Sequence, residues 1–412
     1  MPRPLSVLIL GLNYPPERTG IAPYTGALAT GLSACGHRVR VLAAHPHYPE
    51  WAIHDGYGGW ARRGVFGGVE VNRLLHYVPR SPRGVRRLVS ELTFGIRLIS
   101  SRWRVPRVVI VVSPSLFSSA LAVARSKFGV RRPVLITWVQ DIYSLGMEET
   151  GEGGRLVRLI TRWVESFTLR ASDKVVVIHP RFKEYLVRHL GVPEHLVVVI
   201  RNWTHLPPLP ETDCNRAKEI LGWPTGVTLA VHTGNMGAKQ GLRNVVDAAR
   251  LADQMGAAAH FVLVGDGSER RALEALAEDV SRITFVPALD DGAYRVALSA
   301  ADVLLVNEQP GVAAMAVPSK LTSYFDAGRP IIAATDRSGT AAAEVTAAGA
   351  GTVVPAGDPA QLLEAVMMFG ADPETASRLG RNGRRYRETQ LDQDVALQKW
   401  ASLIESAVEQ DG

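Results

Sequence analysis

Cysteine is almost absent from this chain of 412 residues, since Cys35 and Cys214 are the only two. So few cysteines exclude a disulfide framework and a cysteine-based metal site, and a reducing, cytoplasmic setting is the simplest interpretation. No spacing of His, Asp and Glu imposes metal ligation either. The sequence therefore predicts no disulfide scaffold, no bound metal and no other cofactor.

Long apolar runs are also missing. No stretch approaches about 18 uninterrupted apolar residues, so we expect no transmembrane helix. The apolar run Leu5–Leu10 ends in Gly and Pro-Pro and not in a small-residue cleavage site, so it reads as a strand and not as a signal peptide. With 46% hydrophobic and 21% charged residues, the composition is that of a globular protein of two or three domains.

Acidic residues are scarce in the first half of the chain. Residues 1–205 hold 28 Lys and Arg against 13 Asp and Glu, a formal charge of +15, whereas the remainder hold 18 against 27, a charge of −9. A basic half joined to an acidic half suggests that the basic half meets an anionic partner. A nucleic acid, a bilayer surface and a phosphorylated acceptor are the candidates.

The basic residues are densest between Arg80 and Arg107, where eight arginines surround a single acid, Glu91, and apolar residues interleave. This pattern favours an anionic membrane surface, and a charge-rich helix that packs on the core is the alternative. Nucleic-acid binding would need aromatic residues among the arginines and a known module, so no nucleic-acid partner is predicted.

Short apolar runs that are rich in β-branched residues alternate with helix-length segments along the chain. Runs without internal alternation are typical of parallel strands buried on both faces, and their alternation with helices predicts doubly wound α/β sheets. The predicted strands are Leu5–Leu10, Val39–Ala43, Val69–Leu74, Val108–Val112, Val134–Val139, Lys174–Ile178, Val197–Ile200, Val227–His232, His260–Val264, Ile283–Val286, Val303–Val306, Pro330–Ala333 and Gly351–Val354.

Two glycine-rich turns, each between a strand and a helix, divide the chain into similar halves. The first runs from Tyr14 to Gly20 and the second from Thr233 to Leu242. Exposed backbone N–H groups and a helix N-terminus make such a turn an anion site. In the second turn, three glycines permit close approach of a phosphate and Lys239 supplies a cation. Two such turns predict two Rossmann-like halves that face each other across a cleft.

A proline cluster in Asn202–Asp213 marks a linker between the halves. We therefore predict two Rossmann-like domains, an N-terminal one over 1–205 and a C-terminal one over 206–390. Residues 391–412 are predicted to form a C-terminal helix that packs back across the domain junction.

The second turn, Thr233-Gly234-Asn235-Met236-Gly237 with Lys239-Gln240-Gly241-Leu242, resembles the donor-phosphate loop of retaining GT-B glycosyltransferases of family 4. The resemblance covers almost the whole chain and is nearest to the branch that builds exopolysaccharides such as colanic acid and O-antigens. The other matching motifs are His45-Pro46-His47-Tyr48-Pro49-Glu50-Trp51, Trp138-Val139-Gln140-Asp141-Ile142-Tyr143, Arg201-Asn202-Trp203, Val264-Gly265-Asp266-Gly267, Val317-Pro318-Ser319-Lys320 with Tyr324, and Ala327-Gly328-Arg329-Pro330.

This resemblance implies transfer of a sugar from a nucleotide diphosphate, expected to be UDP, to an acceptor hydroxyl with retention of configuration and without a metal. The acceptor is expected to be a lipid-linked saccharide, and the enzyme cytoplasmic, with docking on the inner face of the cell membrane. The alternatives are a soluble natural-product acceptor and a non-catalytic relative that binds sugar nucleotides. A nicotinamide-dependent oxidoreductase does not fit, because prolines occupy the turn after Gly11 where GxGxxG would stand.

The resemblance also implies that the N-terminal domain binds the acceptor and the C-terminal domain the donor, and it implies the site residues. Asp141, at the carboxyl end of a strand, is the expected catalytic carboxylate, and a helix N-cap is the alternative. Those expected to bind the donor are Gly20, Gly234, Asn235, Lys239, Gln240, Ser319, Lys320 and Ser323. Those expected to bind the acceptor are Tyr24, His45, His47, Tyr48 and Trp51. Packing within a loop is the alternative for the polar–aromatic cluster of His45, His47, Tyr48 and Trp51. His179 is expected to be structural.

The chain departs from the family pattern in two places. The wider family places Arg and Lys near Asn235 and Gln240, and it places a pair of Glu at Met315 and Ser323. The second Glu normally holds the nucleotide ribose, to which a serine makes at most a shorter contact. Lys320 is expected to recover some of the lost positive charge.

Overall fold

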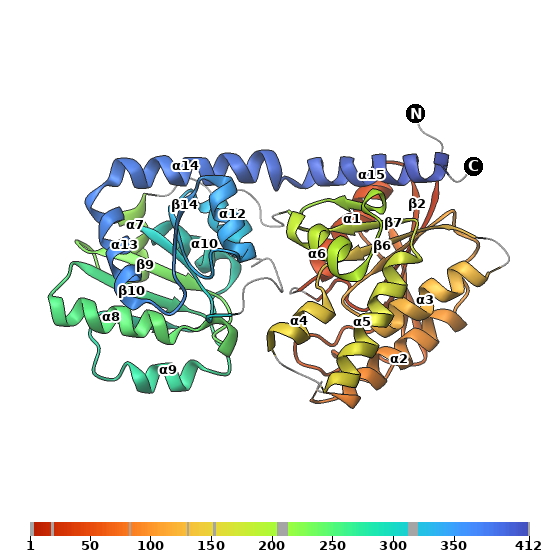
Figure 1. The fold of residues 1–412 in the computed structure, drawn as a ribbon, viewed down its shortest axis with the longest axis horizontal. Helices are drawn as coiled ribbons and strands as arrows, with labels where there is room; N and C mark the ends of the chain where they lie inside the picture. The colour runs from red at the N-terminus through yellow and green to blue at the C-terminus, as the bar shows by residue number, and fades with distance from the viewer. Residues whose placement is uncertain are drawn as a thin grey trace. The chain divides into compact units, whose positions relative to one another are not determined.

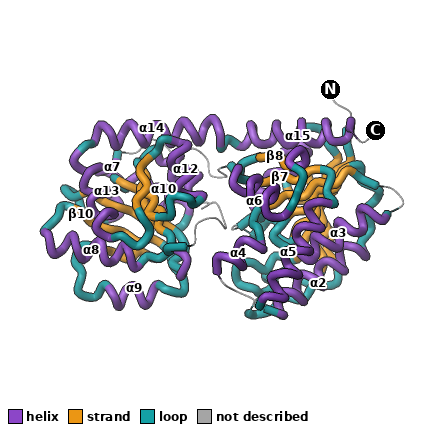
Figure 2. The backbone as a smooth tube through the Cα atoms, in the orientation of Figure 1, coloured by secondary structure: helices purple, strands orange, loops and turns teal. Residues whose placement is uncertain are grey.

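The computed structural model describes residues 4–17, 20–81, 84–129, 132–150, 154–203, 213–311 and 320–410 (Figure 1). By its internal contacts the chain divides into an N-terminal unit, residues 1–205 with 393–412, and a C-terminal unit, residues 206–392. In each unit a largely parallel sheet lies between helices (Figure 2), so the predicted α/β class is confirmed. The predicted linker falls mostly on residues 204–212, outside the described part of the chain.

The N-terminal unit holds a sheet of eight described strands in the order β3-β4-β2-β1-β5-β6-β7-β8. All neighbours are parallel except β3 and β4. The strands are β1 Ser6–Gly11, β2 Arg38–Ala44, β3 Ala61–Phe66, β4 Val69–Leu74, β5 Val108–Val112, β6 Val134–Val139, β7 Lys174–Val177 and β8 Val197–Val199.

The sequence predicted seven of these strands and missed β3. Strands β5 and β6 are buried at every position, which is why their sequences show no alternation. Strand β3 is exposed at all six positions and contains Arg62, Arg63 and Gly64. It pairs only with β4 at the edge of the sheet and therefore needs no apolar run.

Helices cover both faces of this sheet. The C-terminal helix α15 belongs to this unit, and its Trp400 is fully buried with its ring 5.1 Å from that of Trp138. Trp138 in turn stacks on Trp203 at 6.2 Å. The helices are α1 Ala22–Ala34, α2 Val85–Ser100, α3 Leu116–Phe128, α4 Tyr143–Thr150, α5 Arg155–Arg170, α6 Pro180–Leu190 and α15 Gln393–Gln410, with a short 3-10 helix, η1, at Glu194–Leu196.

The C-terminal unit holds a fully parallel sheet in the order β11-β10-β9-β12-β13-β14. Its strands are β9 Thr228–Thr233, β10 Ala259–Val264, β11 Ile283–Val286, β12 Val303–Asn307, β13 Ile331–Ala334 and β14 Gly351–Val354, each within one residue of its predicted bounds. Its helices are α7 Cys214–Leu221, η2 Ala238–Gln240, α8 Arg243–Met255, α9 Arg270–Leu276, α10 Asp291–Ala300, α11 Lys320–Ala327, α12 Thr340–Ala348, α13 Pro359–Ala371 and α14 Pro373–Gln390.

The position of Trp400 gives a test of the fold. We expect Trp400→Ala to lower the free energy of unfolding of the N-terminal unit by about 3–5 kcal/mol, because it leaves a cavity beside Trp138. Urea titration followed by circular dichroism would measure the change. Lys399→Ala, one residue earlier and exposed, is the matched control and should be nearly neutral. Equal stabilities for the two variants would show that α15 does not complete this core.

Candidate functional site

The carboxyl ends of parallel strands are where α/β proteins bind ligands, and three loops of the C-terminal unit meet there. The glycine-rich loop Thr233–Leu242 follows β9, the Gly265–Gly267 turn follows β10, and Glu308 and Gln309 follow β12. A cavity of about 420 Å³ borders this edge, and its lining includes Gly237, Gly241, Glu269, Gln309 and Gly357.

The glycine-rich loop lies directly on the turn after β10. The backbone N–H of Gly234 donates to the Val264 carbonyl and that of Met236 to the Asp266 carbonyl, both at 2.8 Å. Gly265 has a φ of 137°, and a Cβ there would lie 2.0 Å from the Gly234 carbonyl oxygen. Only glycine allows this approach, so the Val264-Gly265-Asp266-Gly267 motif supports the loop.

The far end of the loop is held by Asn307, the last residue of β12. Its side-chain amide donates to the carbonyls of Gln240, at 2.7 Å, and Gly241, at 2.9 Å, and it accepts from the side chain of Asn244. Asn307 is buried. The sequence analysis missed it, and its position at a strand's carboxyl end was the only available signal.

Asn235 and Gln240 lie near the positions where the wider family has Arg and Lys, and their side chains form hydrogen bonds within the loop. The Gln240 Oε1 atom accepts from the backbone N–H of Gly237 at 3.1 Å and from the Asn235 side chain at 3.4 Å. Both side chains therefore help to fix the loop's own shape. Lys239 is exposed on η2 and is the one cationic side chain of the loop sequence.

A second cation, Lys320, lies beneath the loop. It is half-buried, and its Nζ is 3.7 Å from the position that a Cβ of Gly234 would occupy. The same Nζ is 3.1 Å from Nε2 of His232, whose Nδ1 is 3.2 Å from the Leu305 carbonyl. We assign the imidazole proton to Nδ1, which donates to that carbonyl and leaves Nε2 to accept from the lysine.

Burial decides the protonation of this pair. It lowers the pKa of Lys320 to about 7, although the carboxylate of Glu308 acts in the opposite direction. Burial, and then the neighbouring Lys320, lower the pKa of His232 well below its usual range, so the imidazole is neutral. The pair can therefore carry one positive charge next to Gly234.

The remaining predicted donor residues lie on α11 or just before it. Ser323 is buried and hydrogen-bonded to the Tyr294 hydroxyl, which also bonds Thr233. Tyr324, from the same motif, is fully buried, and its hydroxyl accepts from the backbone N–H of Thr233 at 2.8 Å. Ser319 lies outside the described residues.

In the N-terminal unit, the predicted acceptor residues separate into buried and partly exposed sets. Tyr24, His45 and His47 are buried, and the ring of Tyr24 meets that of Trp203 edge-on. Tyr48 and Trp51 are half-buried and are the members that a ligand could reach. Burial therefore favours the packing interpretation for the two histidines, and Tyr24 is likewise buried.

Gly20 lies against this cluster. Its φ is 65°, in the left-handed region that glycine tolerates, and a Cβ there would lie 3.6 Å from the Tyr48 ring. The structure thus brings Gly20 and Tyr48 together, two residues that the sequence analysis assigned to different substrates.

Glu17, which no sequence pattern indicates, is a buried carboxylate that bonds to the loops after β1 and β2. Its Oε1 accepts from the backbone N–H groups of His47, at 2.8 Å, and Tyr48, at 2.9 Å. Its Oε2 accepts from the N–H of Tyr14 and the side chain of Asn13. One side chain therefore ties the loop after β1 to the loop after β2.

Two buried glutamates likewise support the loop that carries Asp141, which is itself half-buried. Glu165 accepts from the backbone N–H of Tyr143 at 2.8 Å and of Ser144 at 3.0 Å. Glu91 accepts from the Tyr143 hydroxyl at 2.6 Å. Burial raises the pKa of both glutamates, and these hydrogen bonds oppose that rise.

Other predicted residues have structural roles. As expected, His179 caps α6, its Nδ1 accepting from the backbone N–H of Arg181 at 3.1 Å. Within the Arg80–Arg107 segment, Arg87 bonds the Tyr143 hydroxyl and Arg97 the Trp60 carbonyl. Helix α2 also packs on α3, as the packed-helix alternative expects. Membrane docking by this segment stays a prediction.

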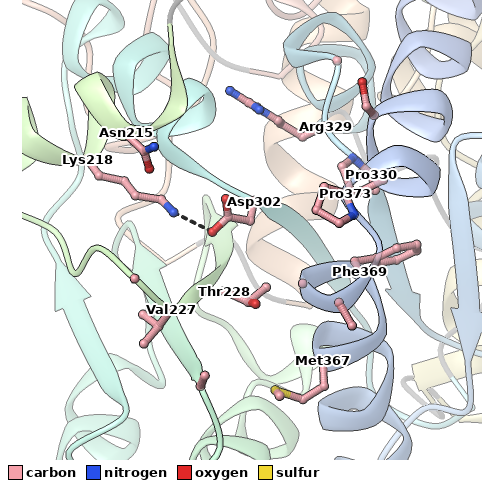
Figure 3. A pocket seen from close by; sticks show the side chains of 17 residues that line it. Asn215, Lys218, Val227, Thr228, Asp302, Arg329, Pro330, Met367, Phe369 and Pro373 are labelled. Atoms are coloured by element: carbon pink, nitrogen blue, oxygen red, sulfur yellow. Dashed lines mark hydrogen bonds and ion pairs between the residues drawn. The ribbon is translucent and has the colours of Figure 1, made fainter.

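A larger cavity, of about 580 Å³, lies at the opposite, amino edge of the C-terminal sheet. Figure 3 shows Lys218 pointing toward Asp302, with Nζ 2.6 Å from Oδ2. None of the predicted donor residues that the structure describes lines this cavity. Across the described part of the chain, no three His, Cys, Asp or Glu side chains are placed to hold a metal ion.

Comparison with protein families gives two matches that together span most of the chain. Residues 19–203 match the glycosyl transferase 4-like domain, and residues 213–386 match the glycosyl transferases group 1 family. A putative colanic acid biosynthesis glycosyl transferase, WcaI of Escherichia coli, is 31% identical over 79% of this chain and 82% of its own. A probable glycosyltransferase, WbjE of Pseudomonas aeruginosa, is 25% identical over 81% of each.

Solved structures agree on the fold. Sucrose-phosphate synthase from Thermosynechococcus elongatus aligns with a TM-score of 0.76 at 19% identity, over 97% of this chain and 98% of its own. Anabaena Alr3699/HepE in complex with UDP aligns at 0.67 and 15% identity, over 98% and 100%. WaaG, a glycosyltransferase involved in lipopolysaccharide biosynthesis, aligns at 0.65 and 18% identity, over 97% and 99%.

The position of Glu17 gives a test of the N-terminal loops. We expect Glu17→Gln to lower the free energy of unfolding by about 1–3 kcal/mol, because the amide cannot accept from all four donors. Urea denaturation would measure the change. Glu50→Gln, in the loop after β2 and exposed, is the control and should stay within about 0.5 kcal/mol of the parent. A neutral Glu17→Gln would mean that the two loops hold their positions without this carboxylate.

Proposed function

The chain belongs to family 4 of the GT-B glycosyltransferases, and on that premise we propose that it transfers a sugar from a UDP-sugar to a hydroxyl group of a lipid-linked saccharide. The transfer proceeds with retention of the anomeric configuration, without a metal ion or other cofactor. The enzyme works in the cytoplasm, at the inner face of the cell membrane. The role in colanic acid biosynthesis that is named for the relative WcaI supports a saccharide acceptor.

The observation that carries this proposal is the glycine-rich loop with Lys320 beneath it. Gly234, Asn235 and Lys239 are exposed on the loop, which leads into the N-terminus of α8. A diphosphate on this loop meets backbone N–H groups, the positive end of a helix and up to two lysines. Solved structures of the neighbour Alr3699/HepE contain UDP and UDP-glucose, which supports UDP as the nucleotide.

In this proposal the loop stabilises the leaving group. Negative charge accumulates on the diphosphate as the glycosidic bond breaks, and preorganised N–H groups and ammonium groups stabilise that charge. The departing phosphate oxygen accepts the proton of the acceptor hydroxyl on the same face of the sugar, which retains the configuration. Asp141 orients that hydroxyl, and Tyr48 and Trp51 offer ring faces to the acceptor sugar.

A non-catalytic sugar-nucleotide-binding protein is the second candidate. Asn235 and Gln240 bond each other in place of presenting two cations, and Ser323 bonds Tyr294 from the buried side of α11. Both features weaken the donor site relative to the family pattern. A glycosyltransferase acting on a soluble natural product is the third, and it shares the donor site but not the acceptor.

Release of UDP separates these candidates. The full chain is incubated with UDP-glucose, UDP-galactose or UDP-N-acetylglucosamine, each with and without a polyprenyl-diphosphate-linked saccharide. Acceptor-dependent UDP release from one donor is expected. Binding of UDP without release under any condition would favour the non-catalytic candidate. Release that requires a soluble aglycone and ignores the lipid-linked saccharide would favour the natural-product acceptor.

The pKa of Lys320 predicts how UDP affinity depends on pH. In the free protein this pKa is about 7, and a bound diphosphate favours the ammonium form and raises it. Above about pH 7, binding therefore takes up a proton, so affinity falls as pH rises, by up to about tenfold per pH unit. Below about pH 7 the lysine is already charged, and this contribution to affinity stays constant.

Two lysine variants check that dependence by calorimetry with UDP between about pH 7 and 8.5. Lys320→Met should weaken binding and remove the proton uptake. Lys239→Ala should weaken binding by about 1.5–3 kcal/mol, the range for hydrogen bonds to charged groups, and keep the proton uptake. Unchanged affinity in either variant would remove that lysine from the site.

Asp141 gives a test of the acceptor side. We expect Asp141→Asn to reduce kcat by about 100-fold or more, the lower end for loss of a group that moves or orients a proton, and to leave the Tm within a few degrees. Stopped-time UDP-release assays and thermal melts measure the two effects. If the variant unfolds early and keeps its specific activity, Asp141 is a helix cap and not an active-site residue.

A further inference from the structure

Helix α5 exposes most of its apolar residues, and the stripe that it buries is mostly polar. The buried stripe of Arg155–Arg170 consists of Thr161, Glu165, Thr168 and Leu169. A helix on the surface of a globular unit normally shows the opposite arrangement, with its apolar stripe toward the core. The reversal means that packing inside the N-terminal unit does not account for the apolar face of α5.

The exposed apolar residues form one continuous face. Their spacing of three, four and seven residues places them on one side of the helix. The rings of Trp163 and Phe167 stack with centroids 5.9 Å apart and planes inclined by 13°. The members and their exposed fractions are Leu156 70%, Val157 52%, Leu159 56%, Ile160 47%, Trp163 69% and Phe167 40%. Contiguous exposure on this scale marks a binding surface.

The charges on α5 select the partner. Arg155, Arg158 and Arg162 are exposed beside the apolar face, and the backbone carbonyl of His189 holds Arg162. The only acid on the helix, Glu165, is buried and accepts from Tyr143 and Ser144. Apolar and aromatic residues with flanking arginines and no exposed acid match the interface of an anionic bilayer. Two copies of this face would bring their arginines together, which disfavours a second copy.

The neighbouring helices also expose single apolar residues, but the continuous apolar face lies on α5. Helix α5 packs on α3, and α3 packs on α2, and Figure 1 shows the three as neighbouring helices of the N-terminal unit. Phe128, at the end of α3, is 84% exposed, and Val85, at the start of α2, is 73% exposed. Within the described residues, every helix is too short or too polar to cross a bilayer. The surface can therefore lie in the plane of a membrane.

We propose that the apolar face of α5 docks the enzyme on an anionic membrane, with Trp163 and Phe167 inserted among the acyl chains and Arg155 and Arg158 at the headgroups. This surface replaces α2 as the principal membrane contact, because Arg87 and Arg97 already bond inside the unit. The inference gives a route to the lipid-linked acceptor and in that respect rests on the proposed function.

Vesicle co-sedimentation of the full chain tests this surface. Pelleting should be strong with vesicles that contain phosphatidylglycerol and weak with phosphatidylcholine alone. The double variant Ile160→Ser, Trp163→Ser should lose about tenfold or more in binding, because both side chains leave water on docking. Arg155→Gln with Arg158→Gln should weaken binding and reduce its dependence on salt. Because all four side chains are exposed, the Tm of each variant should stay near that of the parent.

The matched control is Val85→Ser with Ile96→Ser. It removes two apolar side chains of α2 that are exposed, as are those of Ile160 and Trp163 on α5. It should keep most of the binding, and a loss as large as that of the α5 variant would overturn the assignment to α5. Equal pelleting with both vesicle types would also overturn it. So would a concentration-dependent dimer, seen in sedimentation velocity, that Trp163→Ser abolishes.

The outcome is separable from the proposed function. UDP release with a detergent-solubilised acceptor should be unchanged in the α5 variant, since none of the four α5 side chains belongs to the donor or acceptor site. Failure of vesicle binding with intact transfer therefore rejects the membrane surface alone. Failure of transfer with intact vesicle binding rejects the proposed function alone.

Discussion

Backbone N–H and C=O groups in the loops after parallel strands need partners, and the candidate site depends on how this chain supplies them. Buried side chains from neighbouring segments do so in both units. Glu17 gathers the loops after β1 and β2, Glu165 holds the segment after β6, and Asn307 fixes the glycine-rich loop. An unsatisfied buried N–H or C=O group costs about 1–3 kcal/mol, so each of these side chains selects one loop conformation out of many. These buried side chains therefore fix the positions of the exposed loop residues that can contact a ligand.

The sheets could be predicted from the sequence because strands buried on both faces leave uninterrupted apolar runs. The same argument fails for β3, whose residues are all exposed. The glycine-rich loop was predictable because glycines at close backbone approaches leave a spacing pattern. Glu17 and Asn307 leave none, since a single buried polar residue has no periodicity and its partners lie in other segments. Tyr24, His45 and His47 are predicted to bind the acceptor, but their burial depends on packing that no local pattern encodes.

Lys320 and His232 show how the charge at a phosphate site can come from below the loop. An exposed lysine keeps its charge at neutral pH, but its side chain samples many conformations. A partly buried lysine has a fixed position before the ligand binds, but burial lowers its pKa. At Lys320 the neutral imidazole of His232 accepts a hydrogen bond from the ammonium group and orients it. Charge at this position therefore depends on what occupies the loop.

The return of α15 to the N-terminal unit has a consequence for synthesis on the ribosome. Residues 393–410 are translated after the entire C-terminal unit, yet Trp400 and its neighbours fill the core beneath β6. The C-terminal unit is contiguous from 206 to 392 and has all its strands before α15 leaves the ribosome. Domains usually complete in the order of their synthesis. Here the first unit to be translated is the last to close its core, so the nascent chain exposes part of that core until α15 has been synthesised.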